Sequence, residues 1–149
     1  MAGMLYLVPT PIGNLSDISA RCRKTFEEAD FIAAEDTRVT LKLLNFLELK
    51  KPLVSYYEHN KLESGPKIVR RIQEGETCVL VSDAGSPAIS DPGEDLVRLC
   101  AEAGLTVCAI PGPCALVTAL SISGLPTGRF CFEGFLSINK KSRQEHLSS

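Results

Sequence analysis

The chain passes from strand to helix through Val79-Leu80-Val81-Ser82-Asp83-Ala84-Gly85-Ser86-Pro87-Ala88-Ile89-Ser90-Asp91-Pro92-Gly93. The apolar start predicts a buried strand, and the end predicts a helix that begins at Pro92 with Asp91 as its N-cap. Because a strand-to-helix connection usually needs far fewer residues, Ser82–Ser90 is predicted to be a binding loop, with an ordinary long turn as the alternative. Gly85 is interpreted as a point of close approach to a ligand, rather than a positive φ, since Pro87 already stiffens the turn.

Length and composition predict one globular domain. The chain has 149 residues, 44% hydrophobic and 23% charged, which is enough to bury a core. The net charge of −2 requires neither a nucleic acid nor a membrane as partner. No apolar run is long enough to span a bilayer and no signal peptide opens the chain, so a cytoplasmic protein is expected. The six cysteines form no C-x-x-C pair and are interpreted as reduced core residues: Cys22, Cys78, Cys100, Cys108, Cys114 and Cys131.

Apolar runs alternate with helical patterns along the chain. This order predicts an α/β fold with a five-stranded, mostly parallel sheet and helices on both faces. The expected strands are Met4–Val8, Phe31–Ala34, Leu53–Tyr56, Cys78–Val81 and Thr106–Ile110.

Capping residues and helical spacing predict the intervening helices. They are expected from Ser16 or Asp17 to Ala29, from Asp36 or Thr37 onward, from Pro66 to Gly75 with an earlier start at Asn60 as the alternative, from Pro92 to Ala103, and from Cys114 to Ser123. The last of these is apolar on all sides, which predicts that it is buried.

The last part of the chain carries two further predictions. Phe130–Phe135 is predicted to be one more strand, and its phenylalanines are expected to cause self-association if nothing covers them. Ser137–Ser149 is polar, so it is either a disordered terminus or the start of a structure that continues beyond it.

Unusual polar or Pro-rich clusters follow every predicted strand. In parallel α/β sheets ligands bind outside the carboxyl ends of the strands, and these clusters are expected to converge on one edge of the sheet. They are Pro9–Asn14, Glu35–Arg38, Glu58–Asn60, Ser82–Ser90 and Pro111–Pro113.

Several familiar chemistries are missing from these clusters. The chain has no G-x-G-x-x-G, no P-loop and no G-x-S-x-G, and its two histidines have no metal-ligand spacing, so no metal site is predicted. The loops after the fourth and fifth strands hold few basic groups, which disfavours a phosphate ligand. They favour a nucleoside-like, cationic or zwitterionic cofactor such as S-adenosylmethionine.

Five segments in order resemble the ribosomal RNA small subunit methyltransferase I family, within the tetrapyrrole-methylase-like group. They are Val8–Leu15, Ala34–Arg38, Val81–Pro87, Asp91–Gly93 and Pro111–Ala115, and Phe130–Leu136 is similar to the family's join between domains. The resemblance implies that residues 1–129 form an N-terminal α/β cofactor-binding domain and that 130–149 form a linker and the start of a truncated C-terminal domain. It also implies a homodimer that uses S-adenosylmethionine to methylate a cytidine ribose 2′-oxygen of small-subunit (16S) ribosomal RNA or the 30S subunit.

The resemblance further implies which residues form the site. The candidates for the base that accepts the 2′-hydroxyl proton are Asp36, Glu35 and His59. Asp36 could instead be only a helix cap, and His59 could serve only its own loop. Arg38 is expected to contact RNA or to pair with Asp36, and Asn60 is expected to bind RNA. The implied cofactor-binding residues are Pro11, Gly13, Asp83, Ala84, Gly85, Ile89, Pro113, Cys114 and Ala115.

Three functions remain open from the sequence. The first is an RNA 2′-O-methyltransferase, and the second is a methylase of the same fold that acts on a small tetrapyrrole. The third is an inactive fragment that only binds RNA or a partner.

Overall fold

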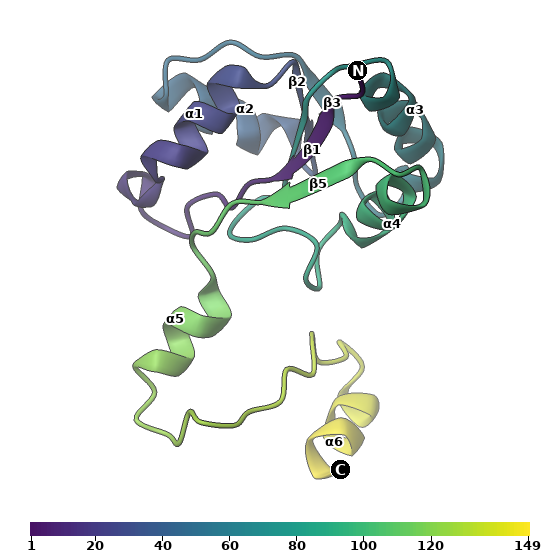
Figure 1. The fold of residues 1–149 in the computed structure, drawn as a ribbon. Helices are drawn as coiled ribbons and strands as arrows, with labels where there is room; N and C mark the ends of the chain where they lie inside the picture. Colours follow the sequence, from purple (N-terminus) through teal and green to yellow (C-terminus); the bar gives the residue numbers. More distant parts are fainter.

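The computed structural model describes residues 1–149 and has a central sheet between two layers of helices (Figure 1). The sheet has five strands, all parallel, in the order β3-β2-β4-β1-β5. This confirms the predicted fold class. The strands are β1 (Met4–Leu7), β2 (Phe31–Ala34), β3 (Leu53–Ser55), β4 (Cys78–Val81) and β5 (Thr106–Ala109).

Helices cover both faces of the sheet, as predicted, because successive side chains of each strand point to opposite faces. In β2, Ile32 and Ala34 pack with the helices of one face, whereas Phe31 and Ala33 pack with those of the other. The first face is covered by α1 (Ala20–Glu28) and α2 (Thr37–Phe46), and the second by α3 (Lys61–Gln73) and α4 (Glu94–Glu102) (Figure 1).

The register brings the strand ends to one edge. Leu7 at the end of β1 lies beside Leu80 and Ala109, and Ala34 at the end of β2 lies beside Val81 and Ser55. The loops that follow these strands therefore leave the sheet from the same edge, which confirms the predicted convergence.

Three helix starts differ from the predictions. Ser19 caps α1, while Leu15–Asp17 forms a separate 3₁₀ turn (η1), so a start at Ser16 or Asp17 is wrong. Helix α3 follows Asn60 and contains Pro66, which confirms the alternative start and not the Pro66 start. Helix α4 begins at Glu94 rather than Pro92, because Gly93 has a φ of 136° that no helical residue can adopt.

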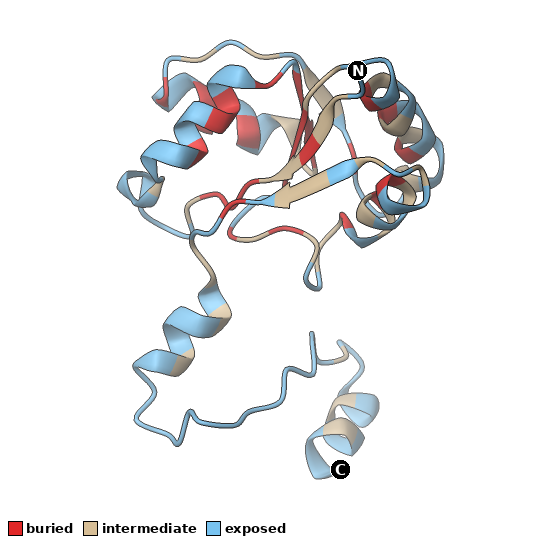
Figure 2. Ribbon diagram, in the orientation of Figure 1, coloured by how far each residue is buried: buried red, intermediate tan, exposed pale blue.

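The last part of the chain differs most from the predictions. Phe130–Phe135 forms no strand, because it pairs with no other strand and a strand needs a hydrogen-bonded neighbour. Helix α5 (Ala115–Ser121) has no buried residue, although its apolar sequence predicts burial, because no layer of the fold covers it (Figure 2). The polar end includes helix α6 (Lys140–Ser148), not only irregular chain.

The cysteines are all free. Cys22, Cys78 and Cys100 are buried in the core as predicted, but Cys108 and Cys114 are half-buried and Cys131 is exposed. None of the helices combines the length and the apolar character needed to cross a membrane.

Candidate active site

Hydrogen bonds join the loops after β1, β4 and β5 into one surface. Thr10 N donates to Gly85 O at 3.2 Å, and Gly85 N donates to Thr10 O at 2.9 Å. The Ser86 hydroxyl donates to Pro113 O at 3.2 Å. Because each bond joins loops distant in sequence, the surface has a defined shape before any ligand binds.

The Ser82–Ser90 loop holds two of the three residues other than glycine that have a positive φ, the third being Glu48 after α2. Ala88 and Ser90, which are not glycine, have φ angles of 70° and 51°. Left-handed conformations cost an L-residue on the order of 1–2 kcal/mol each, so the surrounding structure must hold them in place. This favours the binding-loop interpretation over an ordinary turn.

Glu35 and Asp83 link the loops after β2 and β4. Asp83 N donates to Glu35 Oε2 at 3.3 Å, and Asp36 N donates to Asp83 Oδ1 at 3.1 Å. Partial burial, and then the negative charge of Asp83, raise the pKa of Glu35 above its usual range. Burial likewise raises the pKa of Asp91. The edge therefore holds carboxyl groups that bind protons more tightly than ordinary surface carboxylates.

Asp36 and Arg38 are hydrogen-bonded to each other. Asp36 Oδ1 accepts from Arg38 N at 2.9 Å and caps α2, and its two oxygens accept from Arg38 Nε and Nη2 at 3.1 and 2.8 Å. These bonds lower the pKa of Asp36 to about 2. The capping role expected as an alternative is confirmed, and so is the ion pair with Arg38.

His59 and Asn60 lie in the turn between β3 and α3. Asn60 Oδ1 accepts from Tyr57 N at 2.8 Å, and its Nδ2 donates to Ser55 O at 3.0 Å, so its side chain holds the turn. The exposed His59 ring lies edge-on to Tyr57, with 6.0 Å between the ring centroids.

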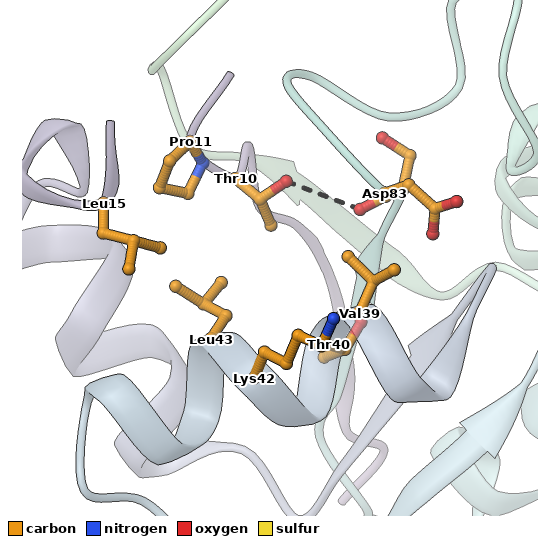
Figure 3. A pocket seen from close by; sticks show the side chains of 9 residues that line it. Thr10, Pro11, Leu15, Val39, Thr40, Lys42, Leu43 and Asp83 are labelled. Atoms are coloured by element: carbon orange, nitrogen blue, oxygen red, sulfur yellow. Dashed lines mark hydrogen bonds between the residues drawn. The ribbon is translucent and has the colours of Figure 1, made fainter. Parts of the chain in front are cut away.

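Three cavities open around the carboxyl edge, and each is named here by one residue. The Lys42 cavity, of about 280 Å³, lies between α2 and the loops after β1 and β4 (Figure 3). The Ile89 cavity, of about 400 Å³, lies between β5, α4 and the loop after β4. The Asp91 cavity, of about 500 Å³, is lined by Glu35, Glu58, Ser90, Asp91, Pro92, Glu94 and Phe135.

The structure does not bring all the expected cofactor-binding residues into one cavity. Pro11 and Asp83 line the Lys42 cavity, and Ile89 lines the cavity named after it. The six others line none of the three, although they lie in the same joined loops: Gly13, Ala84, Gly85, Pro113, Cys114 and Ala115.

Sequence reasoning missed Thr10, Lys42 and Glu94 as cavity-lining residues. Thr10 had a usable signal, since it lies in the Pro-rich turn after the first strand. Lys42 had only its position one helical turn beyond Arg38, which does not distinguish it from any exposed lysine.

Comparison with known proteins supports the resemblance. Residues 4–148 match the model of the Tetrapyrrole (Corrin/Porphyrin) Methylases family. The chain is 55% identical to "Ribosomal RNA small subunit methyltransferase I" of Halalkalibacterium halodurans, over 97% of this chain and 50% of the relative. It is 49% identical to the protein of that name from Escherichia coli O157:H7, over 99% of this chain and 51% of the relative. The chain thus spans about half the length of the curated relatives it matches.

Solved structures of low sequence identity share the fold. Uroporphyrin-III-C-methyltransferase from Thermus thermophilus superposes with a TM-score of 0.62 at 23% identity, over 85% of this chain and 55% of that one. Diphthine synthase superposes with a TM-score of 0.65 at 19% identity, over 83% of this chain and 50% of that one. At these identities the likeness concerns the fold alone.

Proposed function

The chain belongs to the Tetrapyrrole (Corrin/Porphyrin) Methylases family, and from that premise we propose that it is the N-terminal part of an S-adenosylmethionine-dependent ribosomal RNA methyltransferase. The name shared by its curated relatives supports small-subunit ribosomal RNA as the substrate. The resemblance in sequence supports the ribose 2′-oxygen of a cytidine as the acceptor and the cytoplasm as the location. Residues 1–129 form the cofactor-binding domain in this proposal, and 130–149 lead into a second domain.

The charge of the site suits this cofactor, which carries a sulfonium and an amino group. The Ile89 and Asp91 cavities are lined by four carboxylates and by no lysine or arginine: Glu35, Glu58, Asp91 and Glu94. A cationic ligand gains from such surroundings, whereas a phosphate would be repelled. Ile89 and the surface that joins Ser86 to Pro113 would hold the cofactor, with Cys114 and Ala115 beside it.

Glu35 is the best-placed base among the three candidates. Its raised pKa makes it more basic than an ordinary carboxylate, and it lines the Asp91 cavity. Asp36 is a weak base, because Arg38 lowers its pKa to about 2. His59 lines none of the three cavities. The place of Glu35 in the wall of the Asp91 cavity, where it accepts a hydrogen bond from Asp83 N, is the observation that carries the proposed chemistry.

Apart from the base, the methyl transfer requires few catalytic groups from the protein. The cofactor supplies a methyl group that is already activated, so the residues of the edge mainly orient the two reactants. Glu35 would accept the proton of the 2′-hydroxyl, and the cofactor, when bound, would supply the methyl group to that oxygen.

Glu35→Gln tests this role, with Asp36→Asn as the matched control. General-base catalysis contributes about 10²–10⁴-fold, so Glu35→Gln should slow methyl transfer to small-subunit ribosomal RNA by at least about 100-fold. The raised pKa means that the protonated form of Glu35 stabilises the fold at low pH and that this stabilisation is lost as pH rises through the folded pKa. The neutral glutamine should therefore not lower the melting temperature at neutral pH. Equal rates for wild type and Glu35→Gln would exclude Glu35 as the base.

Calorimetric titration of the chain with S-adenosylmethionine separates an enzyme from an inactive fragment. Saturable binding followed by methyl transfer to the RNA is expected. Failure to bind the cofactor would overturn the proposal for this chain, and binding without transfer would overturn its enzymatic part.

A further inference from the structure

The Lys42 cavity is unlike the other two in its lining. Its walls are the aliphatic side chains of Pro11, Leu15, Val39 and Leu43, and its polar groups are hydroxyls, one lysine and the Asp83 carboxylate (Figure 3). Apolar walls with a few polar groups are typical of a site that holds a flat organic ligand.

Two polar groups of this cavity have no partner within the protein. Thr40 is only 3% exposed, yet its hydroxyl makes no hydrogen bond to another residue. Lys42 forms no ion pair, although most basic side chains of the neighbouring helix do. The Thr40 hydroxyl is not fully enclosed and Lys42 is exposed, so both groups are free to bond to a polar ligand in the cavity.

Size and charge identify the kind of ligand. A cavity of about 280 Å³ lies below the roughly 300–1,000 Å³ usual for a whole cofactor-sized ligand, and it has room for one ring system. Lys42 is exposed and forms no ion pair, so it can attract a phosphate, while the Asp83 carboxylate in the same wall accepts a hydrogen bond from Asp36 N. The Asp91 cavity, by contrast, is acidic, and the mainly apolar Ile89 cavity has Glu94 as its one charged residue. A nucleotide unit of RNA meets both conditions.

We propose that the Lys42 cavity binds a nucleobase of the RNA substrate, turned out of its stack, while Lys42 contacts a phosphate of the same strand. The inference rests on the proposed function and adds the place where the substrate is held. Enzymes that modify nucleotides commonly hold an unstacked base in such a pocket. Asp83 lines the cavity and its N–H donates to Glu35, so a base held here lies one residue from the proposed proton acceptor.

Nuclear magnetic resonance of the full 149-residue chain tests the pocket with cytidine monophosphate as the probe. Saturable chemical-shift changes are expected at the backbone amides of four cavity residues: Thr10, Leu15, Val39 and Leu43. Val39→Phe should fill the mouth of the cavity and weaken binding by at least about tenfold. Leu41→Phe is the matched control, because Leu41 is exposed on the same helix and does not line the cavity. Equal affinities of the two variants would overturn the proposal.

Lys42→Met separates the base from the phosphate. This variant should weaken the binding of cytidine monophosphate by roughly fivefold or more and leave the binding of cytidine unchanged, because only the nucleotide carries a phosphate that Lys42 can contact. Lys50→Met, at another exposed lysine without an ion pair, should change neither. An equal effect of Lys42→Met on both probes would exclude the phosphate contact.

The test distinguishes this proposal from the proposed function. If cytidine monophosphate changes the chemical shifts of the Lys42 cavity amides but S-adenosylmethionine does not bind, the pocket is supported and methyl transfer by this chain is overturned. Cofactor binding with nucleotide shifts elsewhere would overturn the pocket alone. Shifts of the same four amides by S-adenosylmethionine would assign the cavity to the cofactor and would also overturn the pocket.

Discussion

Gly85 has a φ of 77°, in the left-handed region that favours glycine. A Cβ here would lie 3.3 Å from Ile12 Cγ2 and 3.4 Å from Pro113 O. The positive φ therefore accounts for this glycine without any ligand, although the sequence favours close approach to a ligand. Gly85→Ala should lower the free energy of unfolding by about 1 kcal/mol or more in the absence of cofactor, measured by denaturant titration.

Gly104 provides the control, because its φ is 68° and a Cβ there would have nothing within 4 Å. Gly104→Ala should show the cost of the backbone conformation alone, and Gly85→Ala should cost more. If Gly85→Ala weakened only cofactor binding and left stability unchanged, ligand approach would be the correct explanation.

Asp36 gives a second prediction at the scale of a residue. Its bonds to Arg38 lower its pKa to about 2, so their contribution to stability is present above the ordinary carboxyl pKa and is lost as pH falls toward 2. Arg38→Gln should raise the pKa of Asp36 toward its model-compound value of 3.8, measured by carbon-detected titration. High salt should shift the wild-type pKa in the same direction, since the pair is on the surface. An unchanged pKa in the variant would show that the backbone cap alone is responsible.

At the scale of an element, the first turn of α3 depends on Lys61. Its Nζ lies 2.8 Å from Glu58 Oε1 and 2.7 Å from Asp95 Oδ2, which joins this turn to α4. Lys61→Met should therefore speed amide hydrogen exchange in the first turn of α3. Lys67→Met, which removes only the exposed pair with Glu63, should not. Equal exchange in both variants would show that Pro66 and the turn at Asn60 hold the helix without Lys61.

The elements also show how far the sequence predicts this fold. The five strands are predicted because apolar runs such as Cys78–Val81 are buried on both faces. Helix starts are less predictable, since Ser16, Asp17 and Ser19 can all cap, and the choice between them is made by packing. The burial of α5 depends on what covers it, which no local pattern encodes.

The candidate site, like the helices and strands, is only partly predictable from the sequence. Its position at the carboxyl edge follows from the alternation of strands and helices. The link between Glu35 and Asp83 joins residues 48 positions apart, so their separate roles require the tertiary structure. The sequence predicts capping by Asp36, because a capping side chain bonds to backbone within four residues of its own position.

At the scale of the whole molecule, α5 lies apart from the sheet and its helices (Figure 2), and beyond it Phe135 lines the Asp91 cavity. Phe130, Phe132 and Phe135 are 54%, 48% and 81% exposed. Exposed apolar surface of this kind is usually covered by another protein surface. The homodimer implied by the resemblance and the second domain proposed above are both consistent with such a cover.

Light scattering tests whether a second copy provides that cover. We expect the chain to form dimers or larger species, and the triple variant F130S/F132S/F135S to shift them toward monomer, because each serine removes apolar area from the contact. Phe46→Ser is the control, since Phe46 is 51% exposed but lies on α2, in the body of the fold. It should leave the distribution unchanged. A monomeric wild-type chain at high protein concentration would exclude self-association through these phenylalanines, and equal loss of the larger species in both variants would assign the contact to general surface hydrophobicity.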